Sequence, residues 1–414
     1  MTDPSAAPSP RPAGTQPDAP HETELTAPVS LTLPSGRLNP ASIGFARSPL
    51  VDTSGIGGRH GWGRNKRWEY WNVMTPAHIV ALTVSSLDYA AVHEVWIFDR
   101  ATAQTWGRSA TVIPVRDVAL PGTLAGGIAI ARAKDLAVTV TPADGGQVWR
   151  LHAEIPGAAF DITVARPADH DCLAVVVPWS PRLFQYTVKD VALPASGTLT
   201  LDGIRHKVPA GSWAVLDHGR GRWPYDIAWN WGAGSGVLPD GRTIGIQVGG
   251  RWTDGTGATE NGVVVAGVLH KISEPVQWTY DLGDPLRPWQ VAGGGLDATF
   301  TPFYDKRSAM DLGVVASRTD QCFGAWAGTF RTDAGVIAFE GIEGFAETVA
   351  REIYVHDAPS NDPQTWPPTP TALADDYRGA AIAALTAALP HLVSPDDPRP
   401  WEPLAPGDPL HAGD

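Results

Sequence analysis

The stretch DHGRGRWPYDIAWNWG, which begins at Asp217, brings acids, arginines, a histidine and aromatic rings into one short piece of chain. A side chain that transfers a proton at neutral pH needs a pKa near about 7, and burial moves the pKa of a carboxyl in that direction. His218 meets this need most easily, because the ordinary pKa of a histidine is about 6.5. We therefore predict that Asp217 or His218 is an acid/base residue. The competing interpretation is an ordinary salt bridge between Asp217 and Arg220.

Two glycines in this stretch, Gly219 and Gly221, favour a tight polar loop. The residues that follow have the composition of a strand, in which alternate side chains share a face. One face is then wholly apolar or aromatic and consists of Tyr225, Ile227, Trp229 and Trp231. This face is either packed core or the wall of a ligand cavity. We assign its aromatic residues, with Arg220 and Trp223, to a ligand site.

A second cluster, GRNKRWEYW at residues 63–71, places three cations directly before aromatic residues. Cations beside aromatic faces can hold a carboxylate or phosphate group of a ligand. On a strand, Trp68 and Tyr70 share one face, and Glu69 lies on the other with Trp71. The alternative is a solvated strand edge whose arginines pair with nearby acids. The predicted contacts are Arg64 and Lys66, which anchor a polar end of the ligand, with Trp68, Glu69 and Trp71.

Further acids occur beside glycines, in TENG with Glu260 and Asn261, and in EGIEGF with Glu340 and Glu343. Two such carboxyls that meet in space could form an acid/base pair, as glycoside hydrolysis requires. Ordinary turn chemistry is the alternative. We predict Glu260 as a third catalytic residue, and Asn261 and Glu343 as ligand contacts. No metal site is expected, because PADHDC near His170 has no second histidine or cysteine at ligand spacing.

Charge and motifs exclude several classes of protein. The formal net charge of −13, without a basic stripe, argues against a nucleic-acid partner. The sequence has no GxGxxG after a strand, no GxxxxGK[ST], no HExxH and no GxSxG, so we expect neither a bound cofactor nor a nucleotide enzyme, zincin or esterase. It also has no signal-like start and no apolar run of about 18 residues, so we expect a cytoplasmic protein without a membrane span. The two cysteines are expected as buried free thiols.

The elements that must position these residues are strands. With 44 glycines and 38 prolines, the chain favours frequent turns over long helices. Short β-branched and aromatic runs recur about every 10 residues, which is typical of antiparallel meanders. A helical period occurs only in TALADDYRGAAIAALTAAL. The predicted divisions are a disordered Pro/Ala-rich arm at 1–25, β domains at 26–200 and 201–356, and a Pro-rich linker with a short helix and tail at 357–414.

Two segments echo each other, KRWEYWNVMTPAHIVALTVSS and YDIAWNWGAGSGVLPDGRTIGIQV, each with a Trp-Asn strand, a turn and a β-branched strand. This pattern predicts two related β halves with a junction near residues 190–210. Coincidence among Trp-rich strands is the alternative.

The runs GRLNPASIGFARSPLVDT, GRNKRWEYWNV, SLDYA, DHGRGRWPYDIAWNWG, TENGV and EGIEGFAE, in this order, resemble a bacterial family catalogued as a domain of unknown function. The resemblance covers about residues 25–355 and brings no activity with it. In strand rhythm the chain is also similar to double lipocalin-like proteins, among them carotenoid 1,2-hydratases, tocopherol cyclases and decalin-forming cyclases. This similarity implies an all-β fold of two lipocalin-like antiparallel β-barrel or sandwich domains with an apolar-ligand site. It carries over no catalytic residue.

Together these features predict an enzyme that binds an apolar or amphipathic small molecule in a Trp-lined cavity. It would catalyse hydration, isomerisation, cyclisation or elimination by proton transfer without a cofactor. A carbohydrate-active hydrolase or lyase, with paired acids such as Asp217 and Glu260, is the second hypothesis. A non-catalytic carrier of a lipid or pigment is the third. Two carboxyls about 5 to 9.5 Å apart at an open groove would favour the glycosidase, whereas a buried acid in a closed apolar site would favour proton transfer.

Overall fold

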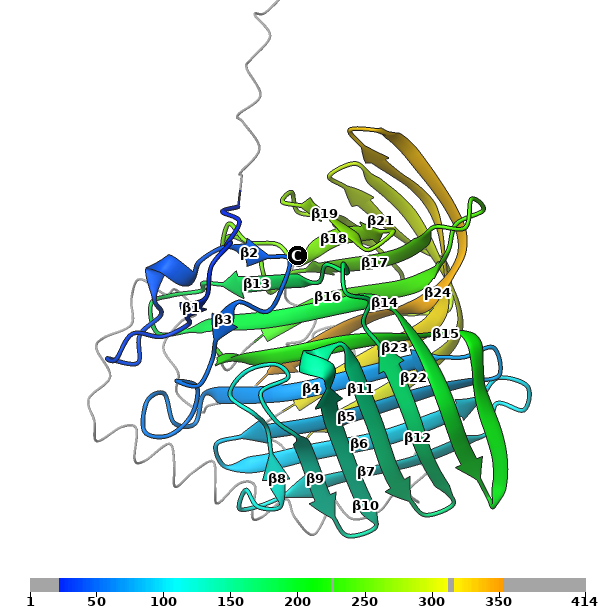
Figure 1. Ribbon diagram of the computed structural model, residues 1–414, viewed down its shortest axis with the longest axis horizontal. Helices are drawn as coiled ribbons and strands as arrows, with labels where there is room; N and C mark the ends of the chain where they lie inside the picture. The colour runs from blue at the N-terminus through cyan, green and yellow to red at the C-terminus, as the bar shows by residue number, and fades with distance from the viewer. Residues whose placement is uncertain (1–21, 225–226, 312–315, 353–414) are drawn as a thin grey trace, which may run out of the picture. The chain divides into compact units, whose positions relative to one another are not determined.

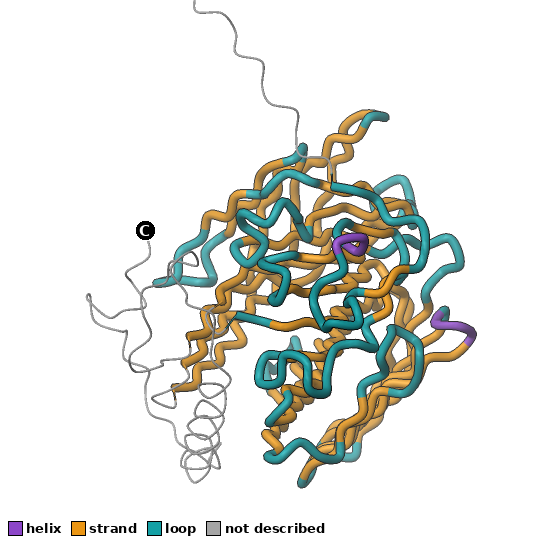
Figure 2. The backbone as a smooth tube through the Cα atoms, turned by 90° about the vertical axis from the view of Figure 1, so that its left-hand side faces the viewer, coloured by secondary structure: helices purple, strands orange, loops and turns teal. Residues whose placement is uncertain are grey.

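The computed structural model describes residues 22–224, 227–311 and 316–352, and these residues form an all-β fold (Figures 1 and 2). The predicted fold class is thereby confirmed, with two separate antiparallel sheets. Two short 3-10 helices, η1 (Pro40–Ser42) and η2 (Asp144–Gly146), and a two-stranded parallel sheet of β1 (Val29–Ser30) and β3 (Val51–Asp52) complete the regular structure of the described residues. The expected C-terminal helix lies outside the described residues. No helix among residues that the structure describes has the length and apolar character to cross a membrane.

The first sheet has 13 strands, arranged along the path β7-β6-β5-β4-β15-β14-β12-β11-β10-β9-β8, with β13 paired to β14 and β2 paired to β13. Figure 1 shows β9–β12 crossing β4–β7, and an apolar core from both layers fills the space between them. Its strands are β2 (Phe45–Ala46), β4 (Asn65–Met74), β5 (His78–Leu87), β6 (Ala90–Asp99), β7 (Thr105–Val112), β8 (Val118–Ala119), β9 (Ala129–Ala133), β10 (Leu136–Ala143), β11 (Val148–Ile155), β12 (Ala158–Ala165), β13 (Leu173–Val177), β14 (Phe184–Leu201) and β15 (Ile204–Arg222).

The second sheet has nine strands in the order β19-β18-β17-β16-β24-β23-β22-β21-β20. It curls around a core of its own, which includes Trp289 and Trp326. Its strands are β16 (Ile227–Val237), β17 (Thr243–Gly250), β18 (Asn261–Val265), β19 (Val268–Ile272), β20 (Gln277–Thr279), β21 (Trp289–Gly293), β22 (Leu296–Asp311), β23 (Ala316–Thr332) and β24 (Gly335–Glu352).

The two sheets share one strand order. Each contains a Trp-rich strand, β4 or β16, that pairs on one side with the next strand in sequence. On its other side it pairs with the last strand of its own sheet, β15 or β24. This common order agrees with the interpretation of the two echoing segments as related halves.

The chain passes from the first sheet to the second between Arg222 and Ile227, and not near residues 190–210, where the sequence pattern predicts the junction. The difference arises because β14 and β15 form one long hairpin that belongs wholly to the first sheet. For the same reason residues 217–222 are not the expected loop. They are the last part of β15, paired on both sides.

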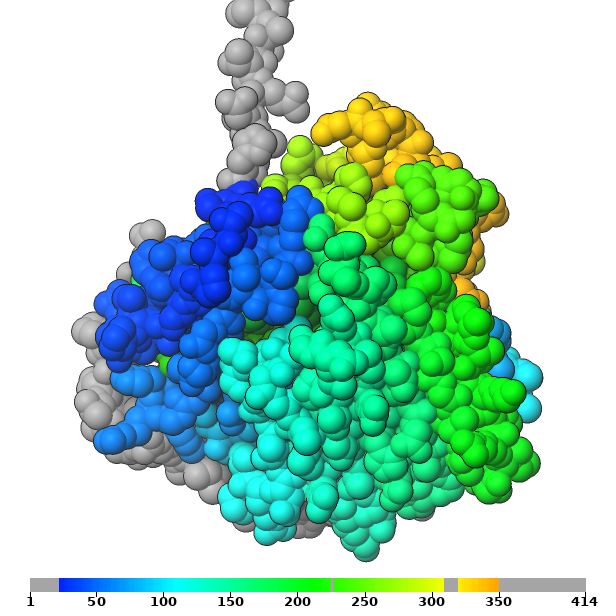
Figure 3. Space-filling view, in the orientation of Figure 1, coloured from blue at the N-terminus to red at the C-terminus, as the bar shows by residue number. Residues whose placement is uncertain are grey.

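The described part of the expected disordered arm, residues 22–25, packs on the body. The buried Glu22 carboxylate forms an ion pair with Lys271 and accepts a hydrogen bond from the Thr259 amide at 3.1 Å. Glu24 forms an ion pair with Arg47 at 2.9 Å. In Figure 3 these N-terminal residues border the light-green segment of the second sheet. Lys271 is a buried cation that needs an acid beside it, and this need explains why residues 22–25 pack on the body. The polar composition of these residues does not by itself indicate such a contact.

A third apolar cluster joins the two sheets. The first sheet contributes Trp96, Phe98 and Val175, and the second contributes Trp231 and Phe345 among others. These side chains alternate along their strands with those that fill the core of each sheet, so the strands that meet in this layer are covered on two faces. Polar residues buried in this layer need partners within it.

Candidate functional site

A buried lysine on β14, Lys189, lies in the layer between the sheets. Its Nζ atom is 3.0 Å from Asp217 Oδ1 and 3.9 Å from Glu260 Oε2. It also lies 4.0 Å from the centre of the Trp231 ring. The side chains of Lys189, Asp217 and Glu260 are only 5, 9 and 2% exposed. One cation and two carboxylates from three separate segments therefore meet away from bulk water.

Strand register explains how the first sheet presents these groups. Lys189 on β14 is directly opposite Asp217 on β15, and Asp217 is directly opposite Tyr70 on β4. Residues that are opposite each other in an antiparallel sheet point to the same face. The three side chains thus form a row across the sheet that faces β16 and β24, where the Trp231 and Phe345 rings pack edge-on against Tyr70.

A third acid, Glu347 on β24, extends the cluster from the other sheet. Its Oε2 atom accepts a hydrogen bond from Gln321 Nε2 at 2.9 Å, and the same amide nitrogen lies 3.1 Å from the Tyr70 hydroxyl. Its Oε1 atom accepts a hydrogen bond from Trp229 Nε1 at 3.0 Å. Asp217 is held similarly, since Trp68 Nε1 donates to its Oδ2 at 2.9 Å. Two of the buried carboxylates are therefore tied to half-buried indole rings.

Burial raises the pKa of both glutamates to about 7. The charge of Asp217 adds to this effect, while Lys189 and the hydrogen bonds from Thr187 to Glu260 and from Trp229 to Glu347 reduce it. Burial also raises the pKa of Tyr70 well above its usual range, with help from the charge of Glu347. At neutral pH the site thus offers carboxyls that can give or take a proton and a phenol that stays protonated.

His218, the neighbour of Asp217, points to the opposite face of β15. Its Nδ1 atom lies 3.5 Å from Glu69 Oε1 inside the first sheet, beside Arg220. Burial and the charge of Arg220 lower the pKa of His218 to about 4. The structure therefore separates Asp217 from His218, because successive strand residues face opposite ways. The Asp217–Arg220 salt bridge is not formed either, since Arg220 pairs with Glu69 at 3.4 Å.

Gly219 lies within strand β15, where the close approach of a neighbouring ring requires a glycine. Gly219 is directly opposite Trp68, and a Cβ atom at Gly219 would lie 2.0 Å from the indole ring. The missing side chain lets the Trp68 ring lie across β15 and reach Asp217. Its role is close approach, not the turn that the sequence analysis expected.

The substitution Gly219→Ala is expected to lower the free energy of unfolding by about 1 to 3 kcal/mol, because the new methyl group displaces the Trp68 ring and breaks its hydrogen bond to Asp217. Urea unfolding monitored by circular dichroism measures this loss. Gly127→Ala is the matched control, since a Cβ atom there meets only Pro121 Cβ at 3.6 Å. Equal stability of the two variants would contradict the assigned role of Gly219.

The cations expected to anchor a ligand lie around Trp223. Arg64 Nη1 donates to the Trp223 carbonyl at 3.1 Å, and Lys66 Nζ is 4.3 Å from the centre of the Trp223 ring. Trp223 also packs edge-on against Trp68 and Trp229. These residues therefore border the cluster on its aromatic side, but they do not contact Lys189.

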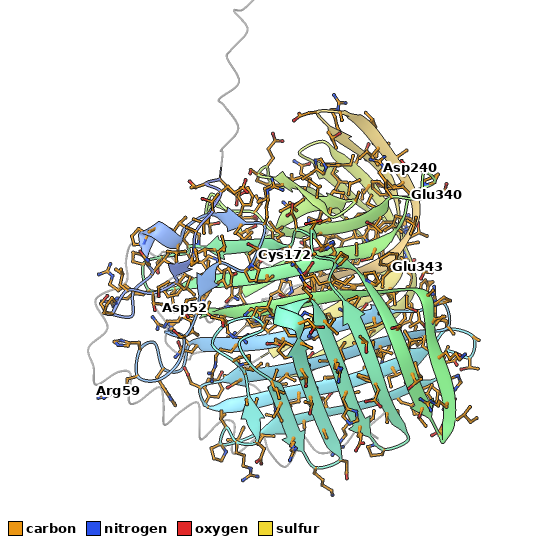
Figure 4. All side chains as sticks on the ribbon, in the orientation of Figure 1. Asp52, Arg59, Cys172, Asp240, Glu340 and Glu343 are labelled. Carbon is orange, nitrogen blue, oxygen red and sulfur yellow. The ribbon has the colours of Figure 1, made fainter. Side chains whose placement is uncertain are left out.

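Other predicted contacts have structural partners instead. Trp71 packs in the core of the first sheet against Trp149, and Asn261 accepts a hydrogen bond from the Gly249 amide at 2.7 Å. Glu343 forms a bidentate pair with Arg100, at 2.6 and 2.9 Å. Figure 4 labels Glu343 on β24, with the exposed Glu340 near it. Trp229 and Trp231 do share the predicted face, which packs against the first sheet. Tyr225 lies outside the described residues.

Sequence reasoning missed Lys189, Glu347, Tyr70 and Gln321 as members of the site. A signal for Lys189 was available, because QYTVKDVAL places the adjacent charges of Lys189 and Asp190 between β-branched residues and the chain has only six lysines. A charge at such a position requires a buried partner. Glu347 gives no comparable signal, because only the contact between the two sheets makes it buried.

Two cavities among the described residues are lined by side chains other than Lys189, Asp217 and Glu260. One of about 430 Å³ is lined by Asn230, Arg251 and Trp278 among others, and one of about 420 Å³ by Arg67, Ser86 and Leu120 among others. Within residues 22–224, 227–311 and 316–352, no group of three or more His, Cys, Asp or Glu side chains is arranged to hold a metal ion.

Several solved structures have a similar course of the chain. An AttH candidate from Nitrosomonas europaea has 15% identity and a TM-score of 0.47, over 70% of this chain and 94% of its own. CghA has 10% identity and a TM-score of 0.47, over 71% and 90%. Kievitone hydratase from Nectria haematococca has 12% identity and a TM-score of 0.45, over 74% and 94%. At these values the similarities assign neither a substrate nor a catalytic residue.

No curated protein matches the sequence. A family match does exist, and it spans residues 22–352, from the packed N-terminal segment to the end of β24. It confirms the resemblance seen in the sequence motifs. The chain belongs to DUF2804, the family described as a domain of unknown function.

Proposed function

We propose that the chain is an enzyme that transfers protons on an apolar or amphipathic small molecule, in a hydration, isomerisation, cyclisation or elimination. The reacting groups are side chains of the cluster of Lys189, Asp217, Glu260, Glu347 and Tyr70, which we name the Lys189 cluster. The observation that carries the proposal is the meeting of two buried carboxylates, Asp217 and Glu260, at one buried lysine, with the buried Glu347 of the second sheet near enough for the lysine charge to act on it.

Such a cluster is difficult to explain as a device for stability. A buried ion pair gains little over apolar residues of the same volume, because both charges lose their hydration. Here the acids outnumber the lysine, so burial keeps a proton on part of the glutamate population at neutral pH. Perturbed carboxyls of this kind are concentrated at functional sites.

The roles within the cluster follow from the contacts. Asp217 holds Lys189 in place, and Glu260 and Glu347 are the candidate proton donors and acceptors. The Tyr70 hydroxyl can stabilise a developing oxyanion by a hydrogen bond. A substrate reaches these groups when the half-buried rings of Trp68 and Trp229 move, and those rings already contact Asp217 and Glu347.

Burial distinguishes this proposal from a glycosidase. Glycoside hydrolysis uses two carboxyls that flank a sugar in an accessible groove. The Asp217 and Glu260 side chains are only 9 and 2% exposed, and a lysine lies against both. A non-catalytic carrier would not need carboxyls whose pKa lies near neutrality. Proton transfer at an apolar site therefore agrees best with the geometry.

The substitution Glu260→Gln is expected to change how stability depends on pH. The Glu260 carboxyl has a pKa of about 7, against an ordinary value of 4.5, so the folded protein holds this proton more tightly than the unfolded chain. Its contribution to stability therefore falls as pH rises from 4.5 to about 7. Glutamine does not titrate, so the variant should gain on the order of 3 kcal/mol relative to wild type across this window.

Urea unfolding of both proteins at pH 5 and pH 8 measures this difference. Burial lowers the pKa values of His93 and His218 to about 4, so these histidines make stability rise with pH, opposite to Glu260. Both proteins contain them, so their effect cancels in the difference between the variant and the wild type. A stability difference that does not change with pH would contradict a raised pKa at Glu260.

The proposed function is tested by incubating the protein in D₂O with small apolar molecules that raise its melting temperature by mass action. Mass spectrometry then detects deuterium at carbon, or the addition or loss of water. Metabolites that accumulate in a gene deletion supply the candidates. Ligands that bind at the Lys189 cluster but are returned without deuterium and without water would instead indicate a carrier.

A further inference from the structure

One end of the first sheet holds the cavity of about 420 Å³, which the proposed function does not use. Its apolar wall comes from the segment between β7 and β9, including Leu120 and Ile128. Its polar side is formed by Arg67 on β4 and Ser86 on β5. The volume lies within the range of small-molecule pockets, about 300 to 1,000 Å³.

The cavity is separate from the Lys189 cluster. Arg67 shares its face of β4 with Glu69 and Trp71, whereas Trp68 and Tyr70 point to the other sheet. The base of the cavity is connected to the buried Arg220, which donates a hydrogen bond to the carbonyl of the lining residue Pro121 at 3.1 Å.

Three arginines lie around this end of the sheet, and two of them have their own partners. Arg220 is fully buried, so its charge requires the Glu69 carboxylate, which lies 3.4 Å away. Arg222 donates hydrogen bonds to Asn65 Oδ1 and to the carbonyls of Gly36 and Gly55. The third arginine, Arg67, lines the cavity.

Arg67 is the cation that faces the cavity. Its Nη2 atom donates to Ser86 Oγ at 3.2 Å, and both residues line the space. Among the residues that the structure describes, no carboxylate lies within 4.0 Å of the Arg67 guanidinium. Asp88 is near enough to feel its charge, but the Asp88 oxygens accept hydrogen bonds from Asn65 and the Gly63 amide.

We propose that this cavity is a second ligand site, which takes an amphipathic molecule with an apolar body and one anionic group. The apolar body lies against Leu120 and Ile128, and the anionic group accepts hydrogen bonds from the Arg67 guanidinium. A planar guanidinium matches a carboxylate well, because it can donate two parallel hydrogen bonds.

The test is calorimetric titration of the full chain with decanoate and with decan-1-ol, which share a chain length and differ in charge. Arg67→Gln is expected to weaken decanoate binding by about tenfold or more and to leave decanol binding unchanged. Arg116→Gln is the matched control, since the Arg116 side chain is 67% exposed, and it should bind both probes as wild type does.

Gly127→Phe provides a second variant that fills the space. Gly127 lines the cavity and does not require a left-handed backbone, and a Cβ atom there meets Pro121 at an ordinary 3.6 Å. This variant should lose both probes, whereas Arg67→Lys should keep decanoate and Glu260→Gln should bind both probes normally. The proposal is overturned if wild type does not bind decanoate, if Arg67→Gln weakens both probes equally, or if Gly127→Phe still binds them.

Discussion

Replacing Lys189 by methionine is expected to lower the free energy of unfolding by about 3 to 5 kcal/mol. Methionine keeps the length of the side chain but removes the charge that lies 3.0 Å from Asp217 Oδ1. Asp217, Glu260 and Glu347 would then be buried together without their cation. The carboxyls would have to take up protons or admit water, and either change destabilises the folded state at neutral pH. Urea unfolding at pH 7.5 measures the loss.

Two further variants identify the cause of that loss. Lys134→Met is the control, because Lys134 is exposed at a turn between β9 and β10, and its substitution should change stability by less than about 0.5 kcal/mol. The double variant Lys189→Met/Asp217→Asn removes the unpaired carboxylate as well and should recover a large part of the stability. If the double variant loses as much free energy of unfolding as the two single variants lose together, the loss comes from packing and not from charge.

Local strand structure was predictable from the sequence because it depends on alternation within a few residues. The β-branched strand HIVALTVSS of the first echoing segment lies within β5, and the predicted sharing of faces by Trp68 and Tyr70 and by Trp229 and Trp231 is confirmed. Period-two patterns report which face a side chain takes. They do not report what lies against that face.

The site was only partly predictable for the same reason. Asp217 and Glu260 were predicted as catalytic, and the structure brings both to Lys189. His218 was predicted with them, but alternation along β15 sends it to the interior of the first sheet. The glycines beside it suggested a loop, whereas Gly219 makes room for an indole ring from the neighbouring strand. Glu347 became visible only through contact between the two sheets.

A large effect on catalysis is expected for Asp217→Asn, because Asp217 holds the lysine beside the proton-transferring Glu260. This substitution keeps the shape of the side chain and can still accept the Trp68 hydrogen bond, but it removes the charge that holds Lys189. Lys189 would then pair with Glu260, whose Oε2 atom is already 3.9 Å away, and Glu260 would lose its ability to hold a proton near neutral pH. A loss of on the order of 10²-fold or more in rate is the usual scale for general acid-base catalysis.

His218→Gln is the matched comparison, because it changes the adjacent residue on the same strand and faces the other way. The His218 side chain is 0% exposed, so this variant is expected to lose stability. Its folded fraction should nevertheless keep its rate, since His218 does not reach the layer between the sheets. The measured rate of each variant must therefore be divided by its folded fraction, which is calculated from its free energy of unfolding.

The most direct test of the Lys189 cluster as the active site is the rate of deuterium incorporation per folded molecule, measured for Asp217→Asn and His218→Gln side by side with the substrate found in D₂O. The account predicts that Asp217→Asn loses about 10²-fold or more while His218→Gln keeps the wild-type rate. Full activity in Asp217→Asn, or an equal or greater loss in His218→Gln, would contradict it.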